Sequence, residues 1–171
     1  MWRVIGAAAY TFTTSILCSW LSLKWSSNTS DIVQRVNIEE LVDLYSKYCR
    51  SILDFAVPVW HSSIAVYESN GIERVQKMAL HVILGDNYRN YETALGLVGL
   101  ETLDSRRTKL CTNCAMKTEQ NPKFKHWFRN KPKVSTRQPT EKYWGPVTRK
   151  TRLKQSPIPY LTNLLNIQHM K

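Results

Sequence analysis

Apolar side chains recur at helical spacing in the first half of this chain. Between residues 38 and 55 an apolar side chain follows every third or fourth position, as expected for one face of a helix. These apolar positions are Leu41, Leu44, Tyr45, Tyr48 and Ile52. Asn37 with Glu40 three positions later is typical of a helix N-terminus. We therefore predict a helix over residues 38–55, which Pro58 ends.

Three more helices are predicted before residue 120. A capping pattern that starts at Asn70 predicts a helix over residues 71–84, ended by Gly85. A shorter helix follows Asn90, and a longer one covers residues 102–119. The apolar side of this last helix is formed by Leu103, Leu110 and Cys114, and its cationic residues that face elsewhere are Arg106, Arg107 and Lys109. Four helices at this spacing predict an all-α fold: a small helical bundle with a basic, largely irregular C-terminal arm.

The composition changes after Gln120. Residues 121–155 contain four prolines, many Lys and Arg, and no apolar periodicity, which predicts a flexible arm. Aromatic residues alternate with the cations, a mixture that lets a segment stack on bases while it contacts phosphates. The aromatic residues are Phe124, Trp127, Phe128, Tyr143 and Trp144. In the alternative, the first three form a short helical turn that docks on the bundle.

The excess positive charge is confined to one part of the chain. Residues 104–154 hold 15 Lys and Arg against three acidic residues, a local net charge of +12, within a chain whose total is +11. Such a block indicates a polyanionic partner, with nucleic acid first and an acidic membrane surface second. The alternative is a solvated tail that aids solubility.

The N-terminal residues are uncharged over about the length of a membrane span. Residues 4–23 carry no charge, but their many Ser and Thr would make insertion weak. A membrane or secretory role is therefore not favoured, and a buried strand is the alternative. The predicted domains are an unplaced apolar segment, 1–30; the helical bundle, 31–120; the basic arm, 121–155; and an apolar segment, 156–171, that forms a short helix closing on the core.

The four cysteines are too few and too irregularly spaced for a disulfide framework. We interpret them as reduced thiols of an intracellular protein, cytoplasmic or nuclear. Cys111 and Cys114 have the C-x-x-C spacing of zinc sites, but no second ligand pair follows. On a helix the two sulfurs fall on a mostly buried face, which favours ordinary core residues and no metal.

The sequence predicts no catalyst and no cofactor. It lacks paired aspartates for two metal ions, a glycine-rich phosphate loop, and the H-E-x-x-H and G-x-S-x-G patterns. The pair Glu39 and Glu40 is better explained by helix capping. His61 stands beside Ser62 and Ser63 without a positioned acidic partner.

Two long runs of the sequence resemble a known family. They are LVDLYSKYCRSILDFAVPVWHSSI and IERVQKMALHVILGDNYRNYETALGLVGLETLDSRRTKLCTNCAMK, followed by FKHWF and SPIPYLTNLLN. The order of ERVQK, VILG, a Tyr-x-x-Tyr pair and RR before Leu-Cys is similar to the post-palm segment of reverse transcriptases of non-LTR retrotransposons, especially the jockey-like group. The resemblance covers residues 41–128 and 156–166. The palm's aromatic-Ala-Asp-Asp motif has no counterpart here.

The resemblance implies a non-catalytic, thumb-like module that packs beside the palm and grips an RNA/cDNA duplex. The expected function is electrostatic binding of RNA or DNA without sequence specificity. The expected phosphate-binding residues are Arg106, Arg107, Lys109, Lys123, Lys125, Arg129, Lys131 and Lys133. The alternatives are a docking module for a complete reverse transcriptase or another partner, and a decayed remnant without a selected function.

The docking hypothesis rests on an apolar patch in the middle of the chain. The patch comprises Ile52, Phe55, Val57, Val59 and Trp60, with Phe55, Val57 and Trp60 as the expected partner contacts. The alternative is that these residues form the core of the bundle itself.

Overall fold

The computed structural model describes residues 36–131, 141–145 and 150–170. Within these ranges the protein is all-α, which confirms the predicted fold class, and they contain no β-strand. One isolated antiparallel bridge joins Asn130 to Tyr143. The uncharged segment 4–23 and the rest of the predicted N-terminal domain, 1–30, lie outside the described residues. None of the helices in the described ranges is long and apolar enough to cross a membrane.

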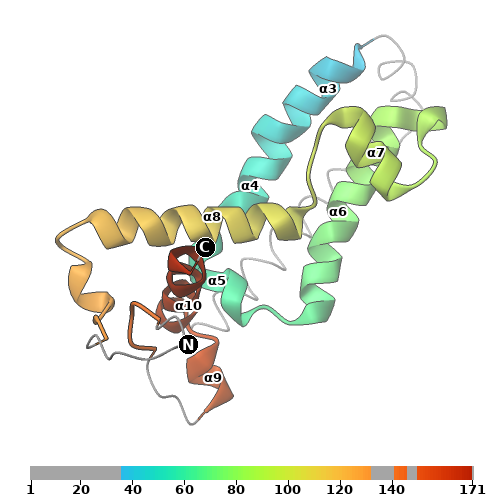
Figure 1. Cartoon of the computed structure of the whole chain (residues 1–171). Coiled ribbons are helices and arrows are strands. Elements are labelled where there is room, and N and C mark those ends of the chain that lie inside the picture. Colours follow the sequence, from blue (N-terminus) through green and yellow to red (C-terminus); the bar gives the residue numbers. More distant parts are fainter. Residues whose placement is uncertain (1–35, 132–140, 146–149, 171) are drawn as a thin grey trace. The chain divides into compact units, whose positions relative to one another are not determined.

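The chain divides into two compact units (Figure 1). The described parts of residues 1–55 and 64–106 form the first unit, and those of 56–63 and 107–171 form the second. In this division residues 107–120 group with the C-terminal segments.

The first helical run begins as predicted. It consists of α3 (Ile38–Leu44), a π-helical turn η1 (Tyr45–Arg50) and α4 (Ser51–Asp54). Asn37 is the N-cap residue, but its backbone carbonyl, not its side chain, accepts a bond, from the N–H of Leu41 at 3.2 Å. The run ends at Asp54, close to the predicted residue 55, but Pro58 is not what ends it. Phe55 is extended and Ala56 is left-handed with φ 52°, and Pro58 lies in the first turn of α5 (Val57–Trp60), where its missing N–H costs nothing.

The central helix of the first unit is α6 (Val66–Leu84). The prediction that Asn70 caps this helix was wrong, because α6 begins four residues earlier. Glu68 caps the helix instead: the Glu68 carboxylate accepts the backbone N–H of Ala65 at 2.9 Å. The helix ends at Gly85 as predicted, where φ is 51°, a conformation that suits glycine.

Helix α6 buries two apolar faces. Ala79 and Ile83 pack with Tyr45, while Leu80 and Leu84 pack with residues of α7 (Tyr91–Val98). The predicted cap of α7 is confirmed, since the Asn90 side chain accepts the N–H of Thr93 at 2.9 Å.

The long helix α8 (Leu103–Gln120) confirms the predicted helix, and its residues from Arg107 onward belong to the second unit. Its buried face differs from the predicted one: it consists of Leu103, Arg107, Cys111 and Ala115, each separated from the next by four residues. Leu110 and Cys114 are only partly buried. A cation thus occupies the face that was expected to be apolar.

The core of the second unit collects residues from distant parts of the chain. It comprises Val57, Cys111, Ala115, Phe128, Tyr143, Leu161 and Leu165. The last two belong to α10 (Pro157–His169), which packs against α5 and so confirms that the C-terminal segment closes on the core. The remaining short elements are the 3-10 turns η2 (His61–Ser63), η3 (Gly85–Asn87) and η4 (Lys125–Trp127), and helix α9 (Thr151–Lys154).

The left-handed backbone at Ala56 predicts local strain that a glycine substitution should relieve. The left-handed conformation destabilises a residue that has a Cβ by about 1–2 kcal/mol. Glycine avoids this strain, although its greater entropy in the unfolded chain offsets part of the gain. We expect Ala56→Gly to raise the free energy of unfolding by about 0.5–1 kcal/mol, measured by urea denaturation. Arg74→Gly, at an exposed position inside α6, should lower it by about 1 kcal/mol. Destabilisation by both glycines would contradict the strain at Ala56.

Candidate nucleic-acid interface

A compact turn follows the end of α8 and carries alternating cationic and aromatic residues. Backbone hydrogen bonds fold it: the N–H of Phe124 donates to the carbonyl of Asn121 at 3.1 Å, and the N–H of Trp127 donates to that of Phe124 at 2.9 Å. The Asn121 side chain accepts the N–H of Lys123 at 3.0 Å. This segment, residues 121–129, is called the basic aromatic turn below.

Phe128 anchors the turn in the core of the second unit. Only 5% of Phe128 is exposed, as is 5% of Tyr143, and the two ring centroids lie 5.7 Å apart. Segment 141–145 runs beside the end of the turn, because the N–H of Trp144 donates to the carbonyl of Arg129 at 2.7 Å and that of Lys131 to the carbonyl of Lys142 at 3.0 Å. Part of the predicted arm is therefore packed on the helices, as in the alternative considered for it.

The other aromatic residues of this region remain at the surface. Phe124 is 38% exposed, Trp127 39% and Trp144 49%. The rings of Phe124 and Trp127 contact each other, with centroids 4.8 Å apart. The aromatic residues of the predicted arm thus divide into two groups, one in the core and one on the surface.

Three of the predicted phosphate-binding cations lie exposed on this turn. They are Lys123, Lys125 and Arg129, and within the described part of the chain none of them forms an ion pair with an acidic side chain. The structure therefore brings together three cations and two exposed rings within seven residues.

The other predicted cations occupy different settings. Lys131 pairs with Glu141 at 2.6 Å, and Lys109 is exposed on α8. Arg106 belongs to the first unit and pairs with Asp54 at 2.7 Å. Lys133 lies outside the described residues.

Arg107 was predicted to bind phosphate at the surface, but the structure buries it. It is only 1% exposed, and its guanidinium lies over the Trp60 ring, 6.0 Å from the centroid. The i, i+4 spacing that continues from Leu103 to Cys111 carries Arg107 inward. A phosphate at the surface cannot reach a side chain in this position.

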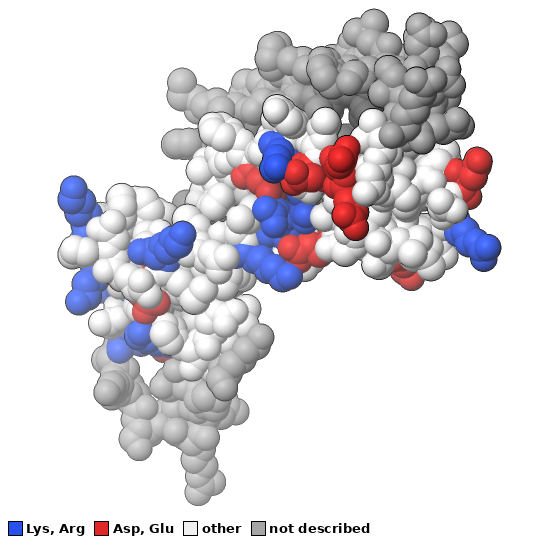
Figure 2. Space-filling model, turned by 90° about the horizontal axis from the view of Figure 1, so that it is seen from above, with Lys and Arg blue, Asp and Glu red and all other residues white. Residues whose placement is uncertain are grey.

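Positive charge does not form one continuous surface on the face drawn in Figure 2. On the face drawn in Figure 2, Lys and Arg side chains stand apart from one another or beside Asp and Glu. The basic aromatic turn is distinguished by its aromatic neighbours as well as by its charge.

Glu119 ties segment 141–145 to two helices. Its Oε1 accepts a hydrogen bond from Lys142 Nζ at 2.8 Å and another from the Tyr143 hydroxyl, and His169 Nε2 lies 3.2 Å away. The Asn166 side chain completes the connection, because its Oδ1 accepts the N–H of Tyr143 at 2.9 Å and its Nδ2 donates to the Tyr143 carbonyl at 3.1 Å.

These bonds change the proton affinities of the groups involved. Burial alone raises the pKa of the Glu119 carboxyl, but the hydrogen bonds from Lys142 and Tyr143 outweigh it and hold the pKa below its ordinary value. The hydrogen bond to Glu119 raises the pKa of Lys142. Burial, followed by the bond to Glu119, raises the pKa of Tyr143. Glu119 and Lys142 are thus held in their charged, paired forms near neutral pH.

The residues of the predicted docking patch are divided between the two units and differ in their exposure. Val57 is fully buried in the core of the second unit, and Trp60 packs partly buried against the same core. The prediction that Val57 contacts a partner is therefore corrected, because Val57 is a core residue, as in the alternative considered for the patch. Phe55 is 78% exposed in the first unit, where Ile52 is 45% exposed.

The described residues contain no cluster of three or more His, Cys, Asp or Glu side chains able to hold a metal ion. Cys111 lies in the core and Cys114 beside Thr118, with Sγ 3.9 Å from its hydroxyl oxygen. Burial raises the pKa of the Cys111 thiol to about 12. Its buried position is the one predicted for an ordinary core residue.

The cluster of Glu119, Lys142, Asn166 and His169 was not predicted from the sequence. No pattern links these residues, which are up to 50 positions apart. The one feature of the sequence that pointed to a packed segment here was the aromatic Tyr143 within a proline-rich basic stretch. No protein-family model matches this sequence, and no curated protein or solved structure is significantly similar to it.

The lowered pKa of Glu119 predicts a pH-dependent contribution to stability. Because the folded pKa lies below the unfolded value of about 4.3, the stabilisation is complete above that value and is lost as the pH falls through the folded pKa. We expect Glu119→Gln to lower the free energy of unfolding by about 1 kcal/mol at pH 7 and by less at pH 3, measured by urea denaturation. Glu141→Gln, which removes an exposed pair, should cost at most about 0.5 kcal/mol. An equal loss for Glu119→Gln at both pH values would refute this role.

The buried thiol predicts a difference in cysteine reactivity. The thiolate is the reactive form, and Cys111 is both fully buried and high in pKa, about 12. With iodoacetamide at pH 8, we expect peptide mass spectrometry to show slower labelling of Cys111 than of the partly exposed Cys49 and Cys114. In urea the three should react at similar rates. Equal rates in the folded protein would show that this core is open.

Proposed function

We propose that this chain is a non-catalytic nucleic-acid-binding module that holds RNA or DNA by charge without reading its sequence. The observation that carries the proposal is the exposure of Lys123, Lys125 and Arg129 on a turn whose Phe128 is fixed in the core. A fixed turn keeps the cations in place before a ligand arrives, so less entropy is lost on binding.

The chemistry of these side chains favours phosphates as their ligands. Lysine and arginine neutralise phosphates and release the counterions condensed on the nucleic acid, which makes binding depend on salt and hardly on sequence. The local net charge of +12 between residues 104 and 154 adds a longer-range attraction. The proposal assigns the phosphate contacts to the basic aromatic turn, with Lys109 and Lys131 as secondary positions, and leaves the buried Arg107 out.

The sequence resemblance supports an origin for such a module. We propose that it derives from the post-palm, thumb-like segment of a non-LTR retrotransposon reverse transcriptase and lacks that enzyme's polymerase chemistry. In this origin the cations are what remains of a surface that gripped the template and its copy.

A second candidate function is docking on another protein, with a complete reverse transcriptase as the partner that the resemblance implies. It is favoured by exposed apolar side chains at helical spacing along α3, η1 and α4, namely Leu44, Tyr48 and Ile52, and by the exposed Phe55 that directly follows α4. In a pull-down with a purified reverse transcriptase, Phe55→Asp should abolish capture if docking is the function. Retained capture would remove this candidate.

Charge removal on the turn tests the proposed function. We expect the variant Lys123→Gln/Lys125→Gln/Arg129→Gln to weaken binding of a labelled oligonucleotide at 50 mM salt by at least roughly tenfold. The magnitude of the slope of log affinity against log salt should fall by about 2 to 3, since each of the three lost contacts contributes about 0.7–0.9. Fluorescence anisotropy measures both quantities.

A variant of equal charge change controls for nonspecific electrostatics. Arg74→Gln/Lys77→Gln/Arg89→Gln removes three exposed cations from the first unit, and it should change affinity by less than roughly threefold because only the general field is altered. Equal losses in the two variants would show that net charge, and not the turn, accounts for binding. A wild-type protein that ignores oligonucleotides at low salt would refute the proposed function.

A further inference from the structure

We infer that the basic aromatic turn and Trp144 form a stacking site for unpaired bases, so that the preferred ligand is single-stranded nucleic acid. This inference rests on the proposed function and adds the ligand class to it. The groups that carry it are the exposed rings of Phe124, Trp127 and Trp144 and the cations Lys123, Lys125 and Arg129.

The arrangement of the rings distinguishes this site from an ordinary charged surface. The N–H of Trp127 donates to the carbonyl of Phe124 at 2.9 Å, and this hydrogen bond closes a turn. The turn brings the Phe124 and Trp127 rings into contact. The imidazole of His126 meets the Trp127 ring edge-on, with centroids 6.2 Å apart. Nearly two fifths of Phe124 and of Trp127 still remains exposed, at 38% and 39%. Each ring is therefore supported by a neighbour while part of it faces solvent.

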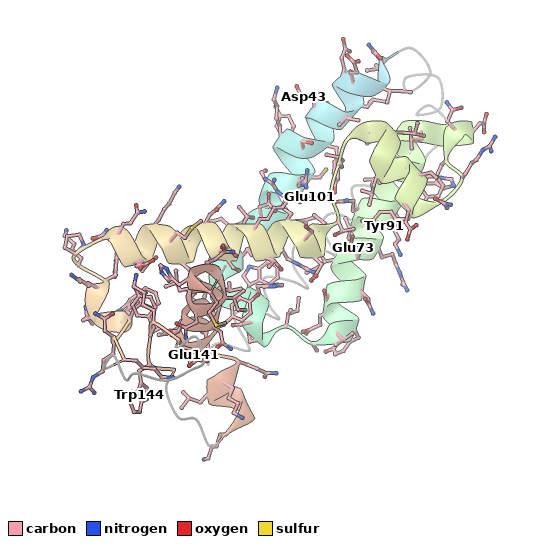
Figure 3. All side chains as sticks on the ribbon, viewed as in Figure 1. Asp43, Glu73, Tyr91, Glu101, Glu141 and Trp144 are labelled. Atoms are coloured by element: carbon pink, nitrogen blue, oxygen red, sulfur yellow. The ribbon has the colours of Figure 1, made fainter. Side chains whose placement is uncertain are left out.

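Trp144 joins this site through the backbone. Its N–H donates to the carbonyl of Arg129 at 2.7 Å, beside the isolated bridge between Asn130 and Tyr143. The side chain extends from segment 141–145 in Figure 3 and is 49% exposed. A second ring-bearing segment is thus held next to the last cation of the turn.

The core-facing neighbours hold these groups in place. Phe128 follows Trp127 directly and Tyr143 precedes Trp144 directly, and each of the two is only 5% exposed. In both segments a buried ring thus stands next to an exposed one. The exposed rings are presented by anchored backbone, which lowers the entropy lost when a base stacks on them.

Unpaired bases are the ligands that match this combination. Aromatic side chains stack on the faces of bases, and the backbone phosphates of the same strand meet nearby Lys and Arg. In a duplex those faces are already covered by neighbouring base pairs, so the rings would gain little. The three cations can contact the phosphates of a duplex as well as those of a single strand. The preference for single strands therefore comes from the rings.

Replacing rings while keeping their apolar character tests the inference. We expect Trp127→Leu and Trp144→Leu each to weaken binding of a fluorescein-labelled 12-nucleotide single strand by roughly 5- to 150-fold, the usual range for one stacked base. Binding of a duplex of equal length should change by less than roughly twofold. The wild-type protein should bind a single strand with abasic positions about as weakly as the Leu variants bind the intact strand.

Phe55→Leu is the matched control, because it removes an exposed ring from the first unit and should leave both affinities unchanged. Far-ultraviolet circular dichroism identifies any variant that fails to fold, and the abasic strand tests stacking in the unaltered protein. Equal wild-type affinity for intact, abasic and duplex ligands, all weakened by the triple Gln variant, would overturn the stacking site and leave the proposed function standing. No oligonucleotide binding at 50 mM salt would remove both.

An anionic membrane surface is the competing ligand class, since Trp and Lys also suit a lipid interface. Vesicles of phosphatidylcholine with phosphatidylserine provide the comparison. We expect Trp127→Leu and Trp144→Leu to leave vesicle binding unchanged. Loss of vesicle binding with intact oligonucleotide binding would overturn the inference.

Discussion

The burial of Phe128 and Tyr143 fixes the ends of two irregular segments, residues 121–131 and 141–145, on the core of the second unit. Each ring comes from a segment whose composition cannot form a core of its own, and both enter the core that α5, α8 and α10 supply. An aromatic side chain removed from water contributes roughly 1.5–3 kcal/mol, enough to offset the ordering of one or two residues. The residues next to these anchors are then fixed at the surface at little additional cost.

The helices could be predicted from the sequence because their signals are local. Apolar periodicity and the cap at Asn90 need only neighbouring residues, and α7 and α8 follow the prediction closely. The departures arise where a tertiary contact or an unusual backbone decides the outcome. Nothing in the sequence marks the left-handed Ala56, and Ala65 offers no capping side chain of its own, so only Glu68 caps α6.

The candidate site was predictable in composition and not in geometry. The mixture of rings and cations after Gln120 could be seen in the sequence, but which rings enter the core depends on contacts with α8 and α10. Arg107 shows the same limit, because its charge suggested a surface role. The helical register turns it inward instead, where its guanidinium lies over the Trp60 ring.

The few acidic residues of the basic region explain which cations are left for a ligand. Within the second unit, Glu119 engages Lys142 and Glu141 engages Lys131, and these two pairs connect the segments on either side of residues 132–140. A cation held by a carboxylate gains less from a phosphate, since the existing pair must first be broken. Lys123, Lys125 and Arg129 have no such pair among the described acidic residues. These acidic side chains therefore hold the basic segment in place and leave Lys123, Lys125 and Arg129 as the cations that the proposed polyanion would meet.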